Sequence, residues 1–455
     1  MSTGREIKPG RKMRGPDMSC VRAAFHTLGC KTNHYETDAL RQQFASAGFT
    51  VVPFDEYAEV YLINTCTVTG EAGRKSRQML HRARRANPDA ILVALGCYSE
   101  LEKFLTDVDV IIGTGGKQNA LAQVCDLLRA RGCHYFPGPG LCATGRAADS
   151  GTAYEEYGSV FQQSETRAYV KVEDGCNNFC SYCVIPLTRG RVRSRDAEAA
   201  LNEVEALAGA GYHEIVLTGI HICSYGADRG QPGWTIMELA GQMAAVDGIE
   251  RIRLGSLEPR SITDEFVALA KKNPCLLPHF HLSLQSGSDA ILKRMHRRYT
   301  TGEYREVVGK LRAAFPDPGL TTDVIVGFPG ETEQEHQESL AFCREIGFSR
   351  LHVFRYSKRE GTLAATFPGQ VDKKTMIRRS QAMIELSDAL ALTYHRRQIG
   401  KQQKVLLEQS GPDGLMTGYS PEYVPVRVAS NPNLLAGQIV SVTGIRATSE
   451  FLFCQ

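Results

Sequence analysis

The chain has 455 residues, of which 42% are hydrophobic and 23% are charged, a balance typical of globular proteins that fold in water. At roughly 150 residues per domain, this length predicts two to four domains. No apolar run approaches the roughly 20 residues needed to cross a bilayer, so a membrane-spanning protein is excluded. The formal net charge of +3 is too small to indicate a polyanionic partner by itself.

The first 20 residues are polar and basic and lack the apolar core of a secretory signal. We therefore expect a disordered leader at 1–20 and a cytoplasmic protein. In such a reducing compartment, the 14 cysteines of the chain are expected to be metal ligands or small buried side chains rather than disulfides.

Apolar runs alternate with helical patterns from residue 21 to residue 134, which predicts a parallel, flavodoxin-like α/β sheet. The expected strands are 23–28, 60–63, 90–95 and 110–112, and the expected helices are 35–47, 72–85, 101–105 and 118–130. Residues 135–165 are rich in Gly, Pro, Ala and Ser and show little periodicity, so we expect them to form a linker.

The alternation of strands and helices resumes over residues 166–395. The expected strands are 168–172, 214–218, 251–254, 279–284, 320–326 and 350–355. Six βα units in series predict a partial TIM-type (β/α)6 barrel. Residues 396–455 carry short β-like runs separated by turns, at 405–408, 423–428, 438–445 and 451–454. They predict a small antiparallel β-barrel, so the expected fold class is α/β with an all-β domain at the end.

A short cysteine-rich loop is the most distinctive motif of the chain. Cys176, Cys180 and Cys183 have the spacing C-x3-C-x2-C, and the next cysteine, Cys223, is 40 residues further on. Three thiolates can hold three irons of a [4Fe–4S] cluster and leave the fourth iron open for a substrate or cofactor. A zinc site would need a second ligand pair nearby, and a disulfide knot suits small secreted domains, so both are weaker alternatives.

A second set of cysteines, Cys30, Cys66 and Cys97, is spread along the first block. Each follows the end of a predicted strand, and glycine precedes two of the three. Because the carboxyl ends of parallel strands converge on one edge of a sheet, these side chains are expected to meet. The prediction is a second three-ligand cluster with an open iron; the alternative is three small buried cysteines.

Basic side chains form three clusters along the chain. Each cluster alone is typical of a solvated face, but three together favour a nucleic-acid backbone as partner. The clusters are Arg74, Lys75, Arg77, His81, Arg82, Arg84 and Arg85; Arg189, Arg191, Arg193 and Arg195; and Lys293, Arg294, Arg297 and Arg298.

Several parts of this sequence resemble the radical S-adenosylmethionine (SAM) methylthiotransferases. The three-cysteine loop, flanked by Asp174-Gly-Cys-Asn and Ile185-Pro-Leu-Thr-Arg-Gly, is similar to the radical SAM signature. Cys30, Cys66 and Cys97 are similar to the second cysteine triplet of these enzymes, and the last block resembles the TRAM RNA-binding module. The resemblance covers about residues 21–455 in the family's domain order.

The resemblance implies two [4Fe–4S] clusters and SAM as cofactors. The Cys176/Cys180/Cys183 cluster would be catalytic, because it would chelate SAM and cleave it on reduction to a 5′-deoxyadenosyl radical. The cluster on Cys30, Cys66 and Cys97 would supply sulfur. The resemblance also implies an external electron donor, such as flavodoxin or ferredoxin, and a monomeric enzyme.

Residues at the carboxyl ends of the barrel strands are expected to bind SAM, because ligands of such barrels gather there. Ser256 and Glu258 could hydrogen-bond its ribose or amino group, although Glu258 could instead be a cap or a surface carboxylate. Gln285 and Ser286 are expected to face the barrel mouth. The full set of expected SAM contacts is Gly219, Ser256, Glu258, Gln285, Ser286, Asp323 and Gly327.

Members of this family modify tRNA or an aspartate of a ribosomal protein. Residues 64–77 and 174–195 are most similar to the branch that acts on N6-threonylcarbamoyladenosine (t6A), which implies methylthiolation at C2 of t6A at position 37 in the anticodon loop of tRNA. Isopentenyl-adenosine in tRNA and the ribosomal-protein aspartate are alternative substrates, and a zinc-stapled RNA-binding protein is the alternative without catalysis.

The arginines that follow the cysteine loop are the expected RNA contacts, because guanidinium groups can fork onto phosphates. In the final block, which is only mildly basic, the best candidate is a single arginine, for which a solvated strand-face charge is the alternative. The expected RNA contacts are Arg189, Arg191, Arg193, Arg195 and Arg427.

Overall fold

The computed structural model describes residues 21–102, 105–132, 153–230, 234–411, 413–429 and 434–455. The predicted leader and residues 135–152 of the predicted linker lie outside these ranges. The chain forms two compact units, Met1–Gln162 with Leu187–Gly190, and Gln163–Pro186 with Arg191–Gln455. Among the described residues, no helix combines the length and the apolarity that a bilayer crossing requires.

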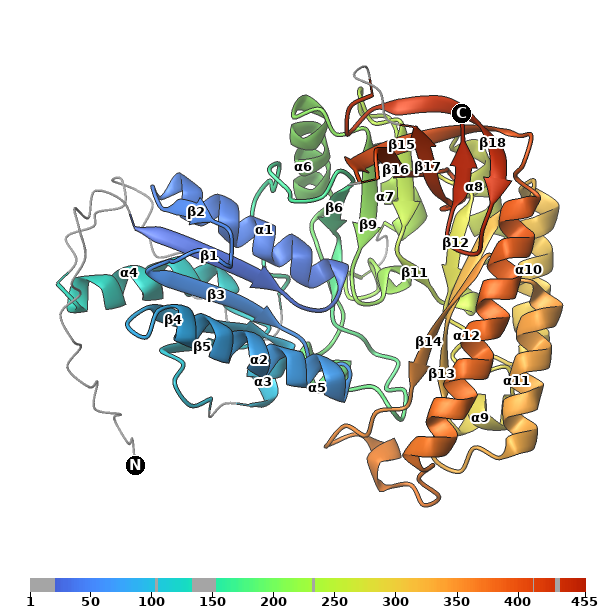
Figure 1. The fold of residues 1–455 in the computed structure, drawn as a ribbon, viewed down its shortest axis with the longest axis horizontal. Coiled ribbons are helices and arrows are strands. Elements are labelled where there is room, and N and C mark those ends of the chain that lie inside the picture. Colours follow the sequence, from blue (N-terminus) through green and yellow to red (C-terminus); the bar gives the residue numbers. More distant parts are fainter. Residues whose placement is uncertain (1–20, 103–104, 133–152, 231–233, 412, 430–433) are drawn as a thin grey trace. The chain divides into compact units, whose positions relative to one another are not determined.

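The first unit contains a five-stranded parallel sheet, drawn in blue in Figure 1. Its strand order, β2-β1-β3-β4-β5, is that of flavodoxin-like folds, which confirms the predicted fold class. The strands are β1 (Arg22–Thr27), β2 (Thr50–Val52), β3 (Val60–Thr65), β4 (Ile91–Gly96) and β5 (Val110–Ile112). The helices are α1 (Lys31–Ser46), α2 (Gly70–Ala86), α3 (Cys97–Leu101) and α4 (Ala120–Ala130), preceded by η1 (Lys117–Asn119).

Helices cover both faces of this sheet. Leu40 and Phe44 of α1 pack with Val124 of α4 on one face, whereas Leu80 and Ala83 of α2 pack on the other. Every residue of β3 and β4 is therefore buried, which explains why these strands are continuous apolar runs without alternation. Two details differ from the sequence prediction: β2 was not expected, and α3 begins at Cys97 rather than at residue 101.

The second unit begins with a partial barrel of parallel strands, shown from green to orange in Figure 1. All six predicted strands are present, in two sheets with the orders β10-β9-β6 and β11-β12-β13-β14. The strands are β6 (Ala168–Lys171), β9 (Glu214–Thr218), β10 (Arg251–Leu254), β11 (Ser256–Leu257), β12 (His279–Leu282), β13 (Gly319–Val326) and β14 (Arg350–Arg355), and a short hairpin pairs β7 (Glu173–Asp174) with β8 (Arg193–Ser194).

Helices pack on the outside of the partial barrel, and several begin with side-chain caps. Thr235, Thr300 and Thr332 each form a capping box with a glutamate three residues later, which satisfies backbone N–H groups that the first turn leaves free. The helices are α6 (Ala197–Gly209), α7 (Ile236–Met243), α8 (Asp264–Lys272), α9 (Asp289–Arg294), α10 (Thr301–Ala314), α11 (Glu333–Ile346) and α12 (Lys373–Arg396), with 3-10 turns η2 (Ile222–Ser224), η3 (Pro259–Ser261) and η4 (Leu363–Thr366). The short helix α5 (Ile185–Thr188) is divided between the two units, because its last two residues belong to the first.

The chain ends in a closed five-stranded barrel, red in Figure 1, with the order β15-β16-β17-β19-β18. The predicted small barrel is confirmed, with two differences: β16 was not expected, and β17 pairs with β19 in parallel while the other pairs are antiparallel. Its strands are β15 (Gln402–Ser410), β16 (Leu415–Tyr419), β17 (Pro425–Ala429), β18 (Ile439–Ala447) and β19 (Leu452–Cys454).

Buried charges join this small barrel to the foot of the partial barrel. The carboxylate of Glu214 on β9 lies 2.8 Å from Arg251 Nε and 2.9 Å from Arg253 Nε, both on β10. Arg253 also donates to the carbonyl oxygens of Ser420 and Pro421, at 3.3 and 3.1 Å. These charges are stabilising only because they are paired and hydrogen-bonded together.

Candidate functional site

The loop that carries Cys176, Cys180 and Cys183 follows β7 at the carboxyl end of the partial barrel's first strand. A turn forms where Cys183 N donates to Cys180 O at 3.0 Å, and Asn178 N donates to Cys176 Sγ at 3.5 Å. Burial raises the pKa of Cys176 to about 11 and that of Cys183 to about 12, and the neighbouring thiols add to both shifts. Thiols on such a loop therefore need a bound metal to hold them as thiolates.

A chain of polar contacts surrounds this loop. Arg297 Nη1 donates to Cys180 Sγ at 3.2 Å, and Arg297 Nη2 donates to Glu258 Oε2 at 2.7 Å. Glu258 also lies 3.7 Å from His221 Nε2, which is 3.1 Å from Asn178 Nδ2. The Arg297 side chain is 6% exposed, so its charge is held beside the cysteine loop rather than in solvent.

Arg297 is a site residue that the sequence analysis missed, because it placed this arginine in a surface basic cluster. Nothing in the local pattern distinguishes Arg297 from Arg294 or Arg298, and only the fold brings it to Cys180. The same contacts support the prediction that Glu258 belongs to the site. His221 and Arg297 lower the pKa of Glu258 against the opposing effect of burial, which favours its ionised form.

Glu173 is a second missed residue, and it explains the glycine at position 219. Its Oε2 accepts hydrogen bonds from the backbone N–H groups of Ile220 and His221, at 2.9 and 2.7 Å. A Cβ atom at Gly219 would lie only 2.7 Å from the same oxygen, so a larger residue would break this turn. Burial raises the pKa of Glu173 to about 8, so this carboxyl group is mostly protonated at neutral pH.

The other predicted SAM contacts differ in how they face the barrel mouth. Ser256 is exposed at the end of the barrel that carries the cysteine loop. Asp323 is partly exposed, and its Oδ1 lies 3.5 Å from His281 Nε2. Gln285 has a positive φ of 68°, a conformation that non-glycine residues rarely adopt, at the end of the fourth predicted strand. These three positions remain candidates for SAM binding.

Two predicted SAM contacts are corrected by the structure. Ser286 is 1% exposed, its Oγ lies 3.1 Å from Ser339 Oγ on α11, and it therefore does not face the barrel mouth. Gly327 is also buried: its N–H donates to Glu331 Oε2 at 2.6 Å, and a Cβ atom there would lie 2.3 Å from the Met376 side chain. Internal packing, rather than approach to adenine, explains this glycine.

Cys30, Cys66 and Cys97 lie at the carboxyl ends of β1, β3 and β4, which are neighbours in the sheet of the first unit. Cys30 precedes α1 and is exposed, whereas Cys66 and Cys97 are buried. Burial raises the pKa of Cys66 to about 11, and the charges of Cys97 and Cys30 contribute, so the three thiols are close enough to interact. The predicted convergence of these strand ends is therefore present.

Close glycine packing brings two of these cysteines together. A Cβ atom at Gly29 would lie 2.9 Å from Cys66 Cβ, and Gly29 has a φ of +108°. Across the described residues, no three His, Cys, Asp or Glu side chains already stand at metal-binding distances. The fit to an iron–sulfur cluster therefore depends on the donor set, which is three soft thiols at each place.

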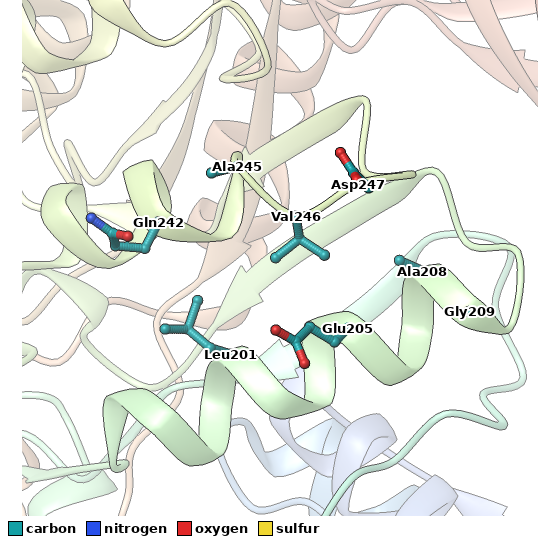
Figure 2. A pocket seen from close by; sticks show the side chains of 8 residues that line it. All are labelled: Leu201, Glu205, Ala208, Gly209, Gln242, Ala245, Val246 and Asp247. Atoms are coloured by element: carbon teal, nitrogen blue, oxygen red, sulfur yellow. The ribbon is translucent and has the colours of Figure 1, made fainter.

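The second unit also has a surface cavity that no cysteine lines. Figure 2 shows it between α6 and α7, on the outer, helical side of the partial barrel, with a volume of about 590 Å³. Its lining residues are Leu201, Glu205, Ala208, Gly209, Gln242, Ala245, Val246 and Asp247. None of them is a cysteine or a predicted cofactor contact, so this cavity is not part of the candidate site.

Comparison with known proteins identifies the family of the chain. The Radical SAM superfamily matches residues 170–343, and the family described as "Uncharacterized protein family UPF0004" matches residues 22–113. The threonylcarbamoyladenosine tRNA methylthiotransferase MtaB of Bacillus subtilis is 39% identical over 93% of this chain and 94% of its own length. The protein of the same name from Thermotoga maritima is 37% identical over 90% and 91%. The chain belongs to the radical SAM tRNA methylthiotransferase family.

A radical SAM tRNA methylthiotransferase uses SAM and [4Fe–4S] clusters, which confirms the predicted cofactors. The tRNA-2-methylthio-N(6)-dimethylallyladenosine synthase of Pelotomaculum thermopropionicum is also similar, at 33% identity over 92% of this chain and 94% of its own. Among solved structures, the radical SAM methyltransferase TsrM of Kitasatospora setae has a TM-score of 0.51 at 14% identity, covering 88% of this chain and 77% of its own, which shows a common fold.

The predicted RNA contacts of this tRNA methylthiotransferase need correction at two positions. Arg189 and Arg195 have fully buried side chains that pair with Glu36 and Glu203, so they cannot present guanidinium groups to a phosphate backbone. Arg193 is partly buried, 3.8 Å from Asp174. The alternation of these arginines in sequence therefore does not mark one exposed basic face.

Two predicted RNA contacts remain available on the surface. Arg191 is exposed, and its guanidinium lies 4.5 Å from the centre of the Phe179 ring, which also places it beside the cysteine loop. Arg427, on β17, is partly exposed; it pairs with Asp413 at 2.6 Å and lies over the Phe451 ring at 4.1 Å. Arg191 and Arg427 thus stay candidates for binding the tRNA backbone.

Proposed function

We propose that the chain inserts sulfur and a SAM-derived methyl group at C2 of t6A at position 37 of tRNA. The observation that carries this proposal is the presence of two separate cysteine triplets, each at the carboxyl edge of a parallel sheet. One triplet suits an iron that binds SAM, and the other suits an iron that carries sulfur. The choice of t6A is supported by the relatives from B. subtilis and T. maritima, which are named for that nucleoside.

The bound cofactors would supply a 5′-deoxyadenosyl radical, a sulfur atom and a methyl group. The chain would supply binding and orientation. Arg297 and Glu258 are a partly buried cation and anion beside Cys180, a pair that suits the carboxylate and ammonium ends of an amino acid such as the methionine part of SAM. Glu173 would hold the Gly219 turn at the edge of the same site.

Isopentenyl-adenosine in tRNA is the second candidate substrate. Relatives named as dimethylallyladenosine synthases are 33–34% identical to this chain, and one relative named for t6A, from Chlamydia pneumoniae, is also only 33% identical. Identity at this level separates the two groups weakly, so the substrate needs a direct test.

Mass spectrometry of tRNA nucleosides would test the proposal. The 2-methylthio derivative of t6A is expected to disappear from a deletion strain and to return when the gene is restored, while the derivative of isopentenyl-adenosine is unchanged. Anaerobically reconstituted protein should methylthiolate tRNA that carries t6A and not tRNA that carries isopentenyl-adenosine. Loss of the isopentenyl derivative alone, or a modified ribosomal protein with both nucleosides unchanged, would show that the proposed substrate is wrong.

A further inference from the structure

Four residues of the chain, Leu187–Gly190, belong to the first compact unit although the residues on both sides belong to the second. Within the first unit, Thr188 O accepts a hydrogen bond of 2.5 Å from Thr114 Oγ1, and the next residue, Arg189, has a fully buried side chain. Arg189 follows Cys183 by six residues. Because a buried guanidinium costs much free energy unless it is paired, the groups that Arg189 contacts decide its role.

Arg189 is part of a buried charge network in the first unit. Its Nη1 donates to Glu36 Oε1 at 2.9 Å, and its Nη2 donates to Asn33 Oδ1 at 2.7 Å. Lys117 forms a hydrogen bond with the other carboxylate oxygen of Glu36. The side chains of Arg189, Lys117 and Glu36 are all 0% exposed, so two cations share one carboxylate out of contact with water.

Asn33 connects this network to the cysteine triplet of the same unit. Its Nδ2 donates to Leu28 O at 2.7 Å and to Thr65 O at 3.1 Å. These carbonyl groups precede Cys30 by two residues and Cys66 by one. One side chain therefore holds both cysteine loops while its oxygen is held by Arg189.

The loop that carries Cys97 is connected to Asn33 through Thr65. Its Oγ1 donates to Leu95 O at 2.5 Å, two residues before Cys97. Contacts of at most two side chains thus lead from Arg189 to all three cysteine loops.

We propose that Arg189 is a positioning residue of the Cys30/Cys66/Cys97 site, which fixes the cysteine loops through Asn33. This inference rests on the proposed function, in which that site donates sulfur. It assigns Arg189 to the sulfur-transfer half of the reaction and not to RNA binding or to cleavage of SAM.

Variants of Arg189 can separate these roles in the full-length, anaerobically reconstituted enzyme. Arg189→Gln is expected to keep 5′-deoxyadenosine formation within about twofold of the parent and to lower the methylthiolated nucleoside at least tenfold, about the effect of 1.4 kcal/mol. Arg189→Lys should restore part of the product because it keeps the charge. Arg129→Gln, which breaks an exposed ion pair with Asp126 in the same unit, is the control and should behave as the parent.

A spectroscopic measurement tests the site without the radical chemistry. In a chain with Cys176, Cys180 and Cys183 replaced by alanine, only the first unit's cluster remains. Addition of sulfide should change the EPR spectrum of the reduced cluster, and Arg189→Gln should weaken that response while Arg129→Gln does not. An equal response in the Arg189 variant would overturn the proposal, whichever nucleoside the enzyme modifies, so failure of the substrate assignment remains distinguishable.

A second variant provides the test if Arg189→Gln does not fold. Arg189→Met replaces the guanidinium with an apolar side chain of similar length and leaves Lys117 and Glu36 as a one-to-one ion pair, so no uncompensated charge is added to the interior. This variant is expected to assemble both clusters and still fail in sulfur transfer. Full product formation by Arg189→Met, or a parallel fall of 5′-deoxyadenosine and product in Arg189→Gln, would show that Arg189 serves only general stability.

Discussion

The two cysteine triplets reach similar ligand sets by opposite routes. Cys176, Cys180 and Cys183 lie within eight residues of one loop, whereas Cys30, Cys66 and Cys97 come from three strand ends spread over 68 residues. Closing a short loop costs little chain entropy, while bringing three distant segments together requires the sheet to form first. The first kind of site is recognised from spacing alone, and the second only from spacing combined with topology.

The surroundings of the two triplets also differ. The loop triplet has Arg297 and Glu258 beside it, a paired cation and anion. The strand-end triplet is held through Asn33 by a buried network that contains Lys117, Arg189 and the carboxylate of Glu36. A zwitterionic ligand suits the first surrounding, whereas the second supports the cysteine loops. Variants of each triplet can show whether the two triplets are separate in function.

Removal of one cysteine from each triplet has the largest expected effect. Cys180→Ala should abolish both 5′-deoxyadenosine formation and the methylthiolated product, because SAM is no longer cleaved. Cys66→Ala should abolish the product and keep 5′-deoxyadenosine formation. Each variant should lose about half of the bound iron, measured together with acid-labile sulfide.

Buried cysteines outside the triplets provide matched controls. Cys125→Ala in α4 and Cys343→Ala in α11 should keep both activities and the full iron content. Product formation at the parental rate by Cys66→Ala would show that the strand-end triplet is not needed.

Loss of Arg297 is expected to act on the loop triplet alone. Arg297→Gln removes the closest cationic partner of the Glu258 carboxylate and should lower the folding stability by about 3 kcal/mol. It also removes a proposed SAM contact, and SAM cleavage is expected to slow roughly a hundredfold. Affinity for SAM, measured by equilibrium binding, should fall, while the iron of the first unit is kept. Arg298→Gln, an exposed neighbour, is the control; cleavage within twofold of the parent in the Arg297 variant would contradict the role of this arginine.

A methyl group at Gly29 is expected to damage the strand-end triplet without replacing any of its cysteines. Gly29→Ala combines a φ of +108° with a contact of 2.9 Å to Cys66 Cβ, and such strain costs about 2 kcal/mol. Urea unfolding should show this loss, and the iron of the first unit should fall. Gly115→Ala, where nothing lies within 4 Å, should be near neutral; equal behaviour of the two variants would show that the packing of Gly29 is unimportant.

The smallest expected effect is a change in pH dependence at the edge of the loop triplet. Because burial raises the pKa of Glu173 to about 8, the folded state binds a proton that the unfolded chain loses near pH 4.5. The contribution of Glu173 to the free energy of unfolding is present in full below that pH. It declines as the pH rises to about 8, by at most about 1.4 kcal/mol per pH unit. Glu173→Gln keeps an oxygen for the two N–H donors and should flatten this decline.

Urea unfolding of the cluster-free protein between pH 5 and 8.5 would measure the effect. The stability difference between the parent and Glu173→Gln should grow in favour of the variant as pH rises. A constant difference over this range would show that Glu173 does not change its protonation on folding.

Most of the fold could be predicted from the sequence, because long apolar runs and helical periodicity dominate it. The missed strands are those whose pattern is weak. β2 has only three residues, and β16 contains Gly418, where a Cβ atom would lie 2.3 Å from Leu406 O. A glycine in the sequence usually indicates a turn. The sequence alone therefore does not show that this glycine lies in a strand, where it allows the backbone of the neighbouring strand to come close.

Spacing alone predicts the loop triplet, and spacing combined with the expected sheet topology predicts the strand-end triplet. The partners of the charged side chains could not be predicted from the sequence. Arg189 and Arg195 resemble the exposed Arg191 in sequence, and they are buried only because Glu36 and Glu203 lie opposite them in the folded chain. The prediction that Ser286 faces the barrel mouth was wrong for a similar reason, because Ser339 on α11 contacts its side chain. Pairing across long sequence separations decides which polar residues face a ligand.

The foot of the partial barrel limits how freely the last barrel could be exchanged between related enzymes. Arg253 binds the backbone carbonyls of Ser420 and Pro421 and lies over the Tyr423 ring at 4.6 Å. Carbonyl groups are common to every sequence, so a transplanted barrel must match the course of its main chain here more than its side chains. Modular inheritance of the last barrel would then be constrained by the shape of a single turn rather than by residue identity.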